Sequence, residues 1–434
     1  MTKQGLMIFA QRSSIILLGF VTTILIATYL TPHQQGYYYA IGSLISSYNL
    51  IELGLPILLV QLSAKFYHKG NTPALNYAAV KKSQNIQFLS FIRWLGKYLI
   101  VISLLIFCLF IPLGYLYFNS AYPNESYIWF KPWICIVFFT ALSVPINSML
   151  AVIEGMGKVK LVYGSRIAVS ILSAFLIWFF IYIGKPLYGP GVMCFSLCLI
   201  AYPLFFKKYK NVIKNALFSK ENYTFNAKKL VWPIHKKSIL MLIASYIFYF
   251  SPNLIVFYFS RSDAGKLGIS IVIASSIVSL AGSSLQSHIS EMSRLYHINK
   301  KNESNKIFRN EYVKTMRYTF IGFLAFLIAL YVIDFTNLSF IKDKILSMQN
   351  FIFLFINFSL MQALTSFSYY FRLRDKDPAS HIYLSTNILS LLTSIWTCSL
   401  FGIEGLLITN LFFILVLCGP LLFKLKRQAH VDFI

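Results

Sequence analysis

Acidic residues are rare in the apolar stretches of this sequence, and Glu52 is the one acid that we place well inside such a stretch. A carboxylate surrounded by hydrocarbon is costly, and it is found where protons or cations move. Ser46 and Asn49 precede Glu52 at helical spacing, which puts a polar stripe on one helix face. Such a stripe faces protein or water rather than lipid. We therefore expect Glu52 to bind a coupling ion, H⁺ or Na⁺, and Ser46 and Asn49 to line a cavity.

A second polar stripe contains Ser275 and Ser279, and two further amides stand next to prolines in apolar stretches, Asn147 after Pro145 and Asn253 after Pro252. Proline interrupts the hydrogen-bond ladder of a helix, and a neighbouring amide can satisfy the freed backbone groups. We expect these four polar residues to line the same cavity. Small and polar residues also let membrane helices pack closely, so a packing role remains the alternative.

Cations near the ends of apolar stretches are candidates for binding an anion. Arg166 stands out because it lies about one turn inside its stretch, and a guanidinium matches the oxygens of a diphosphate with two parallel hydrogen bonds. The weaker candidates are Arg12, Arg93, Arg261 and Lys266. For Arg12 and Arg93, the general excess of Lys and Arg at the cytoplasmic ends of membrane helices is an equally good explanation. Arg261 and Lys266 lie across the membrane, where they could release an anionic headgroup that the other set receives.

Several kinds of chemistry have no signal in the sequence. It has no Gly-rich phosphate loop, no zinc-binding H-E-x-x-H and no G-x-S-x-G turn, and its six cysteines all lie in apolar stretches without metal-ligand spacing. We expect no catalytic residue, no metal and no ATPase or hydrolase activity. The net charge of +25 is dispersed over many short loops, which is not typical of a nucleic-acid-binding face.

The elements that must position these residues are transmembrane helices. The chain of 434 residues is 57% hydrophobic and 12% charged, too apolar for a soluble core. A membrane helix needs roughly 17 to 25 mostly apolar residues. This requirement predicts twelve spans, at Ser13–Leu30, Tyr38–Leu59, Tyr98–Tyr117, Trp133–Ile153, Val162–Ile183, Gly189–Phe206, Ile239–Tyr258, Leu267–Leu285, Tyr318–Ile333, Phe351–Phe371, His381–Leu400 and Gly405–Phe423.

Basic residues alternate between the loops that join these spans. All but six of the 39 Lys and Arg fall on one side, and the six on the other side are Lys131, Lys185, Arg261, Lys266, Lys342 and Lys344. Because Lys and Arg accumulate in cytoplasmic loops, both termini are expected in the cytoplasm, with the chain in a bacterial inner membrane. The loops on the outer side are short, which argues against a membrane polymerase or ligase acting there.

The two halves of the sequence match weakly at an offset of 229 residues. Gly36 pairs with Gly265, Lys65 with Arg294, and the Tyr-His dipeptide ending at His68 with that ending at His297. A repeat of six spans is parallel, because both halves enter the membrane from the same side. We predict an all-α membrane protein of two six-helix lobes. The lobes are residues 1–206 and 238–434, and residues 207–237 form a basic cytoplasmic linker.

Three segments carry a resemblance to a known family. They are Tyr29-Leu30-Thr31-Pro32-His33-Gln34-Gln35-Gly36-Tyr37-Tyr38, then Glu52-Leu53-Gly54-Leu55-Pro56 with Ala64-Lys65, and Glu154-Gly155-Met156-Gly157-Lys158-Val159. With the length and the twelve predicted spans, the chain resembles the polysaccharide-transport branch of the multidrug/oligosaccharidyl-lipid/polysaccharide (MOP) exporter superfamily. Within it, the chain looks like the O-antigen flippases of the Wzx type.

The resemblance implies a transporter rather than an enzyme, with a MATE/MOP-like fold. Its implied substrate is an undecaprenyl-diphosphate-linked oligosaccharide, moved from the cytoplasmic to the periplasmic leaflet by alternating access. Membrane lipids, a polysaccharide polymerase and a chain-length regulator are the implied partners, and nucleic acid is not among them. The alternative is a cation-coupled multidrug antiporter of the same superfamily, in which Glu52 would be the coupling acid.

Overall fold

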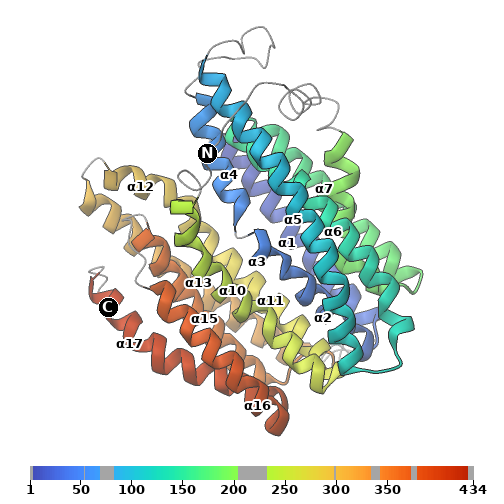
Figure 1. The fold of residues 1–434 in the computed structure, drawn as a ribbon. Coiled ribbons are helices and arrows are strands. Elements are labelled where there is room, and N and C mark those ends of the chain that lie inside the picture. Colours follow the sequence, from blue (N-terminus) through green and yellow to red (C-terminus); the bar gives the residue numbers. More distant parts are fainter. Residues whose placement is uncertain are drawn as a thin grey trace. The chain divides into compact units, whose positions relative to one another are not determined.

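The computed structural model of the protein describes residues 3–52, 54–68, 83–203, 232–297, 300–333, 343–372 and 379–428. Regular structure in these ranges is helical, and they contain no strand (Figure 1). The first helices are α1 (Lys3–Tyr29), α2 (Pro32–Ser46), α3 (Tyr48–Glu52), α4 (Leu55–His68), α5 (Ser83–Ala121), α6 (Ser126–Gly155), α7 (Val159–Tyr182) and η2 (Pro186–Gly191). The others are α10 (Trp232–Phe259), α11 (Arg261–Ser287), α12 (Ile289–His297), α13 (Lys301–Ile333), α15 (Met348–Arg372), α16 (Ala379–Phe413), η3 (Ile414–Cys418) and α17 (Gly419–Gln428). Most of the predicted linker 207–237 lies outside the described residues.

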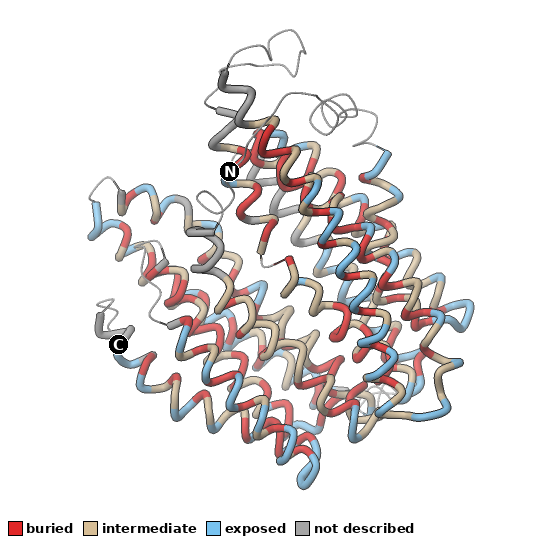
Figure 2. The backbone as a smooth tube through the Cα atoms, viewed as in Figure 1, coloured by how far each residue is buried: buried red, intermediate tan, exposed pale blue. Residues whose placement is uncertain are grey.

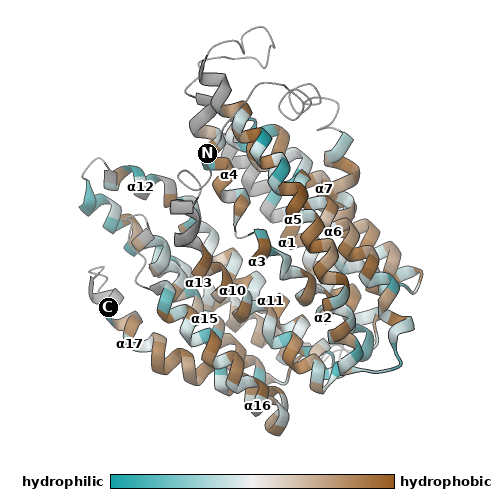
Figure 3. Cartoon of the chain, in the orientation of Figure 1, coloured by the Kyte–Doolittle hydropathy of each residue, from teal (hydrophilic) through white to brown (hydrophobic). Residues whose placement is uncertain are grey.

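Nine helices in the described ranges are long and apolar enough to cross a membrane. They cover the predicted spans from Tyr98–Tyr117 onward, and η2 continues as an apolar helix to Pro203. The apolar part of α1, Ser14–Tyr29, is shorter. In Figure 3, hydrophobic residues cover most of α5 and α6, whereas α12 is largely hydrophilic. The chain is therefore a multi-pass membrane protein.

The predicted span Tyr38–Leu59 is not one helix, which corrects the sequence prediction. The chain forms α2, the single turn α3 and then α4. At Ser47 the hydroxyl donates to the carbonyl of Leu44 at 2.6 Å, and such local side-chain bonds compete with the helix. Gly54 has a φ of 72°, a left-handed conformation that suits glycine, and α4 then starts one residue before Pro56. Glu52 consequently ends a short helix instead of lying inside a long one.

The helix α16 contains a sharp reversal at Gly402, where φ is 59° and ψ is −142°. Beyond it the chain folds back on itself, since the hydroxyl of Thr397 donates to the carbonyl of Gly405 at 3.2 Å and lies 2.9 Å from that of Thr409. Thr386 likewise meets Cys418 at 3.2 Å. The two arms of this hairpin correspond to the predicted spans His381–Leu400 and Gly405–Phe423.

Two compact units divide the chain, and the first comprises Met1–Leu25 and Leu44–Ile239. Within it, α6 packs against α4, α5, α7 and η2, and it is the most buried of the apolar helices (Figure 2). Trp133 on α6 is fully buried and donates its indole N–H to the carbonyl of Phe110 at 3.0 Å. A Cβ on Gly114 would lie 2.1 Å from this ring, so glycine makes room for the tryptophan. The apolar core of this unit is thus built around α6.

At the C-terminal end of α6, close packing against α4 depends on the small size of Gly155. A Cβ there would lie 1.9 Å from the Ser63 hydroxyl and 2.3 Å from the Val60 carbonyl, both on α4. We expect Gly155→Ala to lower the free energy of unfolding by about 1 to 3 kcal/mol, the usual cost of an overpacked core. Thermal denaturation of the purified protein measures this. Gly164→Ala on α7 is the control, because a Cβ there meets nothing within 4 Å. Equal melting of both variants would contradict the packing of α4 on α6.

The second unit comprises Leu240–Ile434 together with Ile26–Ser43, which we call the α1–α2 tip. In the C-terminal part, α11 packs against α13 and α15, and α15 packs against α16. The amphipathic α12 packs on α13, where Met292 and Phe308 are both fully buried. Although the tip belongs to the N-terminal half of the sequence, it packs with the C-terminal residues.

Candidate functional site

Arg166 on α7 forms an ion pair across the turn that joins α6 to α7. Its guanidinium lies 3.2 Å from a carboxylate oxygen of Glu154 near the end of α6. The hydroxyl of Tyr163, one turn earlier on α7, donates to the other Glu154 oxygen at 3.0 Å, and the Arg166 guanidinium lies 5.1 Å from the Tyr163 ring centre. Two residues therefore fix the guanidinium in place.

The side chain of Arg166 extends from the face of α7 that is turned away from lipid. At 100° per residue, the exposed apolar residues of α7 lie within about 40° of the direction opposite to Arg166; they are Ala168, Ile171, Phe175, Phe179 and Tyr182. On the Arg166 side, Val162, Val169 and Ser173 are buried. The Arg166 side chain is nevertheless 28% exposed. Arg166 is thus partly accessible on the side of the helix that also carries buried residues.

Glu52 is buried at the end of α3, with 3% of its surface exposed. Its Oε1 has no hydrogen-bond partner among the described residues. Tyr48, Tyr98 and Cys194 are near enough to interact electrostatically with its carboxylate. An unpaired charge is costly in such surroundings.

Two of the polar stripe residues bond to carbonyls three residues earlier in the chain. Asn49 is exposed and donates to the carbonyl of Ser46 at 2.9 Å, and Ser275 donates to that of Val272 at 3.0 Å. Ser279 is exposed and Asn147 is half-buried. Both the cavity and the packing interpretations remain open for these residues.

Asn253 is almost fully buried, and it ties α10 to the α1–α2 tip. Its amide donates to the hydroxyl of Ser43 at 3.4 Å, and Tyr246 donates to the carbonyl of Ser43 at 3.2 Å. The Oδ1 of Asn253 is buried with no hydrogen-bond partner in the described part of the chain. The interaction with Ser43 therefore uses only the donor side of this amide.

The remaining predicted cations lie apart from Arg166 along the chain. Arg93 is half-buried on α5, and Arg12 lies in α1 with its side chain outside the described residues. Arg261 begins α11, with its guanidinium 5.9 Å from the ring centre of Tyr37, and Lys266 is half-buried on the same helix. Arg261 is thus part of the packing around the α1–α2 tip.

Glycines allow that tip to approach α11 very closely. A Cβ on Gly36 would lie 2.1 Å from the carbonyl oxygen of Arg261, and one on Gly265 would lie 2.8 Å from the Gln35 side chain. A Cβ on Gly268 would lie 2.3 Å from the ring of Tyr39. The contact therefore has backbone against backbone, with no room for side chains at these glycines.

Buried polar groups close the same contact. Gln35 is fully buried and donates to the carbonyls of Ile26 and Leu30, at 3.1 and 3.2 Å. Lys344, which precedes α15, also donates to the Leu30 carbonyl, at 2.7 Å, and its partial burial lowers the pKa of its amine from the ordinary value. Together these donors satisfy the carbonyl end of α1, as buried helix ends require.

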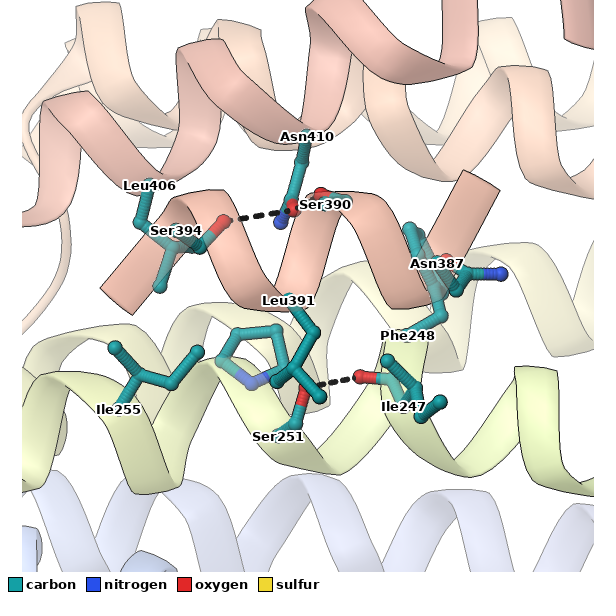
Figure 4. Close-up of a pocket in the computed structure, with 11 residues that line it drawn as sticks. Ile247, Phe248, Ser251, Ile255, Asn387, Ser390, Leu391, Ser394, Leu406 and Asn410 are labelled. Carbon is teal, nitrogen blue, oxygen red and sulfur yellow. Dashed lines mark hydrogen bonds between the residues drawn. The ribbon is translucent and has the colours of Figure 1, made fainter. Parts of the chain in front are cut away.

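A small polar pocket of about 10 Å³ lies between α10 and the two arms of the α16 hairpin (Figure 4). Asn410 accepts hydrogen bonds from Ser390 and, at 3.4 Å, from Ser394. Ser251 and Pro252 of α10 complete its wall. The serines of this cluster were not predicted as site residues, although their spacing of four residues on one helical face was a signal for it.

The comparisons with known proteins concern the fold alone. No protein-family model and no curated protein matches the sequence. Among solved structures, the inward-facing conformation of a MATE-family multidrug resistance transporter of the MOP superfamily matches with a TM-score of 0.58 at 13% identity, covering 94% of this chain and 99% of that one. Lipid II flippase MurJ, in an inward closed conformation, matches with a TM-score of 0.59 at 13% identity, covering 99% of this chain and 90% of that one.

A third match is the MATE multidrug transporter DinF-BH, with a TM-score of 0.56 at 11% identity, covering 96% of this chain and 94% of that one. All three proteins are transporters or flippases, and they match nearly the whole chain. The protein therefore has the fold of the MOP-superfamily transporters.

Proposed function

We propose that the protein is a flippase that moves an undecaprenyl-diphosphate-linked oligosaccharide, an O-antigen or similar surface-polysaccharide unit, from the cytoplasmic to the periplasmic leaflet. The fold supports this proposal, because one of its neighbours is a lipid II flippase. The observation that carries it is the position of Arg166, a partly exposed guanidinium on the helix face opposite to lipid. Such a group suits the diphosphate that links lipid and sugar.

The proposed topology has twelve spans, with both termini in the cytoplasm of a bacterial inner membrane. Three features support it besides the asymmetry of the basic residues. The two arms of the hairpin at Gly402 account for two of the proposed spans. The interrupted series from α2 to α4 accounts for one span, and the long α1 accounts for another. A broken membrane helix is tolerated where protein or a water-filled cavity satisfies its backbone. The broken series is therefore a natural place for substrate or ion to enter.

Replacing Arg166 by Ala tests the proposed diphosphate site. Charge-assisted hydrogen bonds to a diphosphate would be lost, so we expect surface polysaccharide to fall by roughly tenfold or more at an unchanged amount of protein in the membrane. The assay uses cells whose own gene for this protein is deleted and which carry the variant gene instead. Arg294→Ala, which removes an exposed cation of α12, is the control and should change little. Normal polysaccharide with Arg166→Ala would disprove the assignment.

Transport must draw on a gradient, and we propose that Glu52 couples it to H⁺ or Na⁺. The burial of this acid supports the proposal equally for the second candidate function, a cation-coupled multidrug antiporter, and two of the three structures named above are multidrug transporters. Two uptake measurements in proteoliposomes separate the two functions. An antiporter takes up a lipophilic cation, whereas a flippase takes up a lipid-linked oligosaccharide. Glycosyltransferase genes beside this gene would favour the flippase.

A further inference from the structure

In this structure the carboxylate of Glu154 is the ion-pair partner of Arg166. The geometry of the pair allows another anion to replace this carboxylate on the guanidinium. The pair is joined by one contact of 3.2 Å, and the Arg166 and Glu154 side chains are 28% and 18% exposed. A guanidinium has five donors and binds best to two oxygens in parallel. A single contact with a partly exposed carboxylate therefore leaves donors for another anion.

A second contact holds Arg166 if the Glu154 carboxylate releases it. The guanidinium lies 5.1 Å from the ring centre of Tyr163, which belongs to the same turn of α7, so this contact does not depend on the ion pair. The hydroxyl of Tyr163 donates to the other oxygen of Glu154 at 3.0 Å, so the released carboxylate still has a partner. Arg166 therefore stays oriented when its partner changes.

We propose that Glu154 is a built-in competitor of the substrate: its carboxylate occupies the Arg166 guanidinium in the empty protein, and the diphosphate of the lipid carrier displaces it. The inference rests on the proposed function and adds a residue that sets how strongly an anion must bind to occupy the site. A competitor raises the Kd of every anion by the same factor, so it leaves the ratio of their affinities unchanged. Anions that bind weakly, such as phospholipids with one phosphate group, then no longer occupy Arg166, whereas a diphosphate, which pairs with the guanidinium through more oxygens, still does.

Binding of farnesyl diphosphate to the purified full-length protein in detergent, measured by calorimetry, tests the inference. We expect Glu154→Gln to lower the Kd about fivefold, the factor that corresponds to a partly exposed ion pair. We expect the same factor for farnesyl monophosphate, at weaker affinity. Glutamine keeps the size of the side chain and still accepts from Tyr163, so the melting temperature should stay near that of the wild type.

The double variant separates competition from a general electrostatic effect. If Glu154 competes for Arg166, Glu154→Gln has no effect on the Kd when Arg166 is already Ala. The inference is overturned if Glu154→Gln lowers the Kd equally in the wild type and in Arg166→Ala, or lowers it in neither. The proposed function still stands after either result, provided that Arg166→Ala alone weakens binding. An unchanged Kd in Arg166→Ala would instead remove the diphosphate site itself, and the proposed function with it.

Discussion

Replacing Gly36 by Ala is expected to stop transport and to destabilise the protein. The new Cβ would lie 2.1 Å from the carbonyl oxygen of Arg261, a group on the backbone that cannot rotate away. Either α11 or the α1–α2 tip must then move, and we expect a cost of about 1 to 3 kcal/mol in the free energy of unfolding. Thermal denaturation and the transport rate in proteoliposomes measure the two effects.

The matched control for this variant is Gly19→Ala. Gly19 lies on α1, earlier in the chain than the tip, and a Cβ there meets nothing within 4 Å. Because alanine is also the better helix former, this variant should be as stable as the wild type or slightly more so. If Gly36→Ala melts and transports like the control, the close contact between the tip and α11 is wrong.

Replacing Glu52 by Gln is expected to uncouple transport from its ion gradient. Glutamine has nearly the same shape but cannot exchange a proton or neutralise a cation, so the rate driven by an imposed gradient should drop to that seen without one. Proteoliposomes with an imposed H⁺ gradient, and in a second series a Na⁺ gradient, provide the measurement and identify the ion.

Glu303→Gln is the control for the loss of one carboxylate. Glu303 is an exposed acid of α13 that pairs only at the surface with Lys300, at 2.9 Å, and exposed pairs contribute little. Its removal should leave the gradient dependence intact. A Glu52→Gln protein that still responds fully to both gradients would show that this acid is not the coupling site.

The sequence predicted the long apolar helices well, because hydropathy over some twenty residues reflects the thickness of the membrane. The interruption at Ser47 was not predicted. It depends on a hydrogen bond from its own hydroxyl to a neighbouring carbonyl, and most serines in membrane helices make such bonds without ending the helix.

Contacts between distant residues were beyond the reach of the sequence. Arg166 was singled out by its depth in a predicted helix, but its partner Glu154 was recognised only as part of a motif. The turn around Gly157, with a φ of 83°, brings the two together, and its geometry does not follow from hydropathy. Whether Glu52 and Arg166 do what their positions suggest remains a prediction for the variants described above.

The packing of the α1–α2 tip has a consequence for how the chain is made. Lys344 reaches the Leu30 carbonyl over 314 residues of sequence. At roughly 5 to 20 residues per second, the ribosome needs on the order of tens of seconds between synthesising the tip and synthesising its last partner. During that interval the buried amide of Gln35 and the bare backbone of Gly36 lack α11 and must be sheltered by lipid, by the insertion machinery or by a chaperone. Assembly of this protein is thus completed only after nearly the whole chain has been inserted.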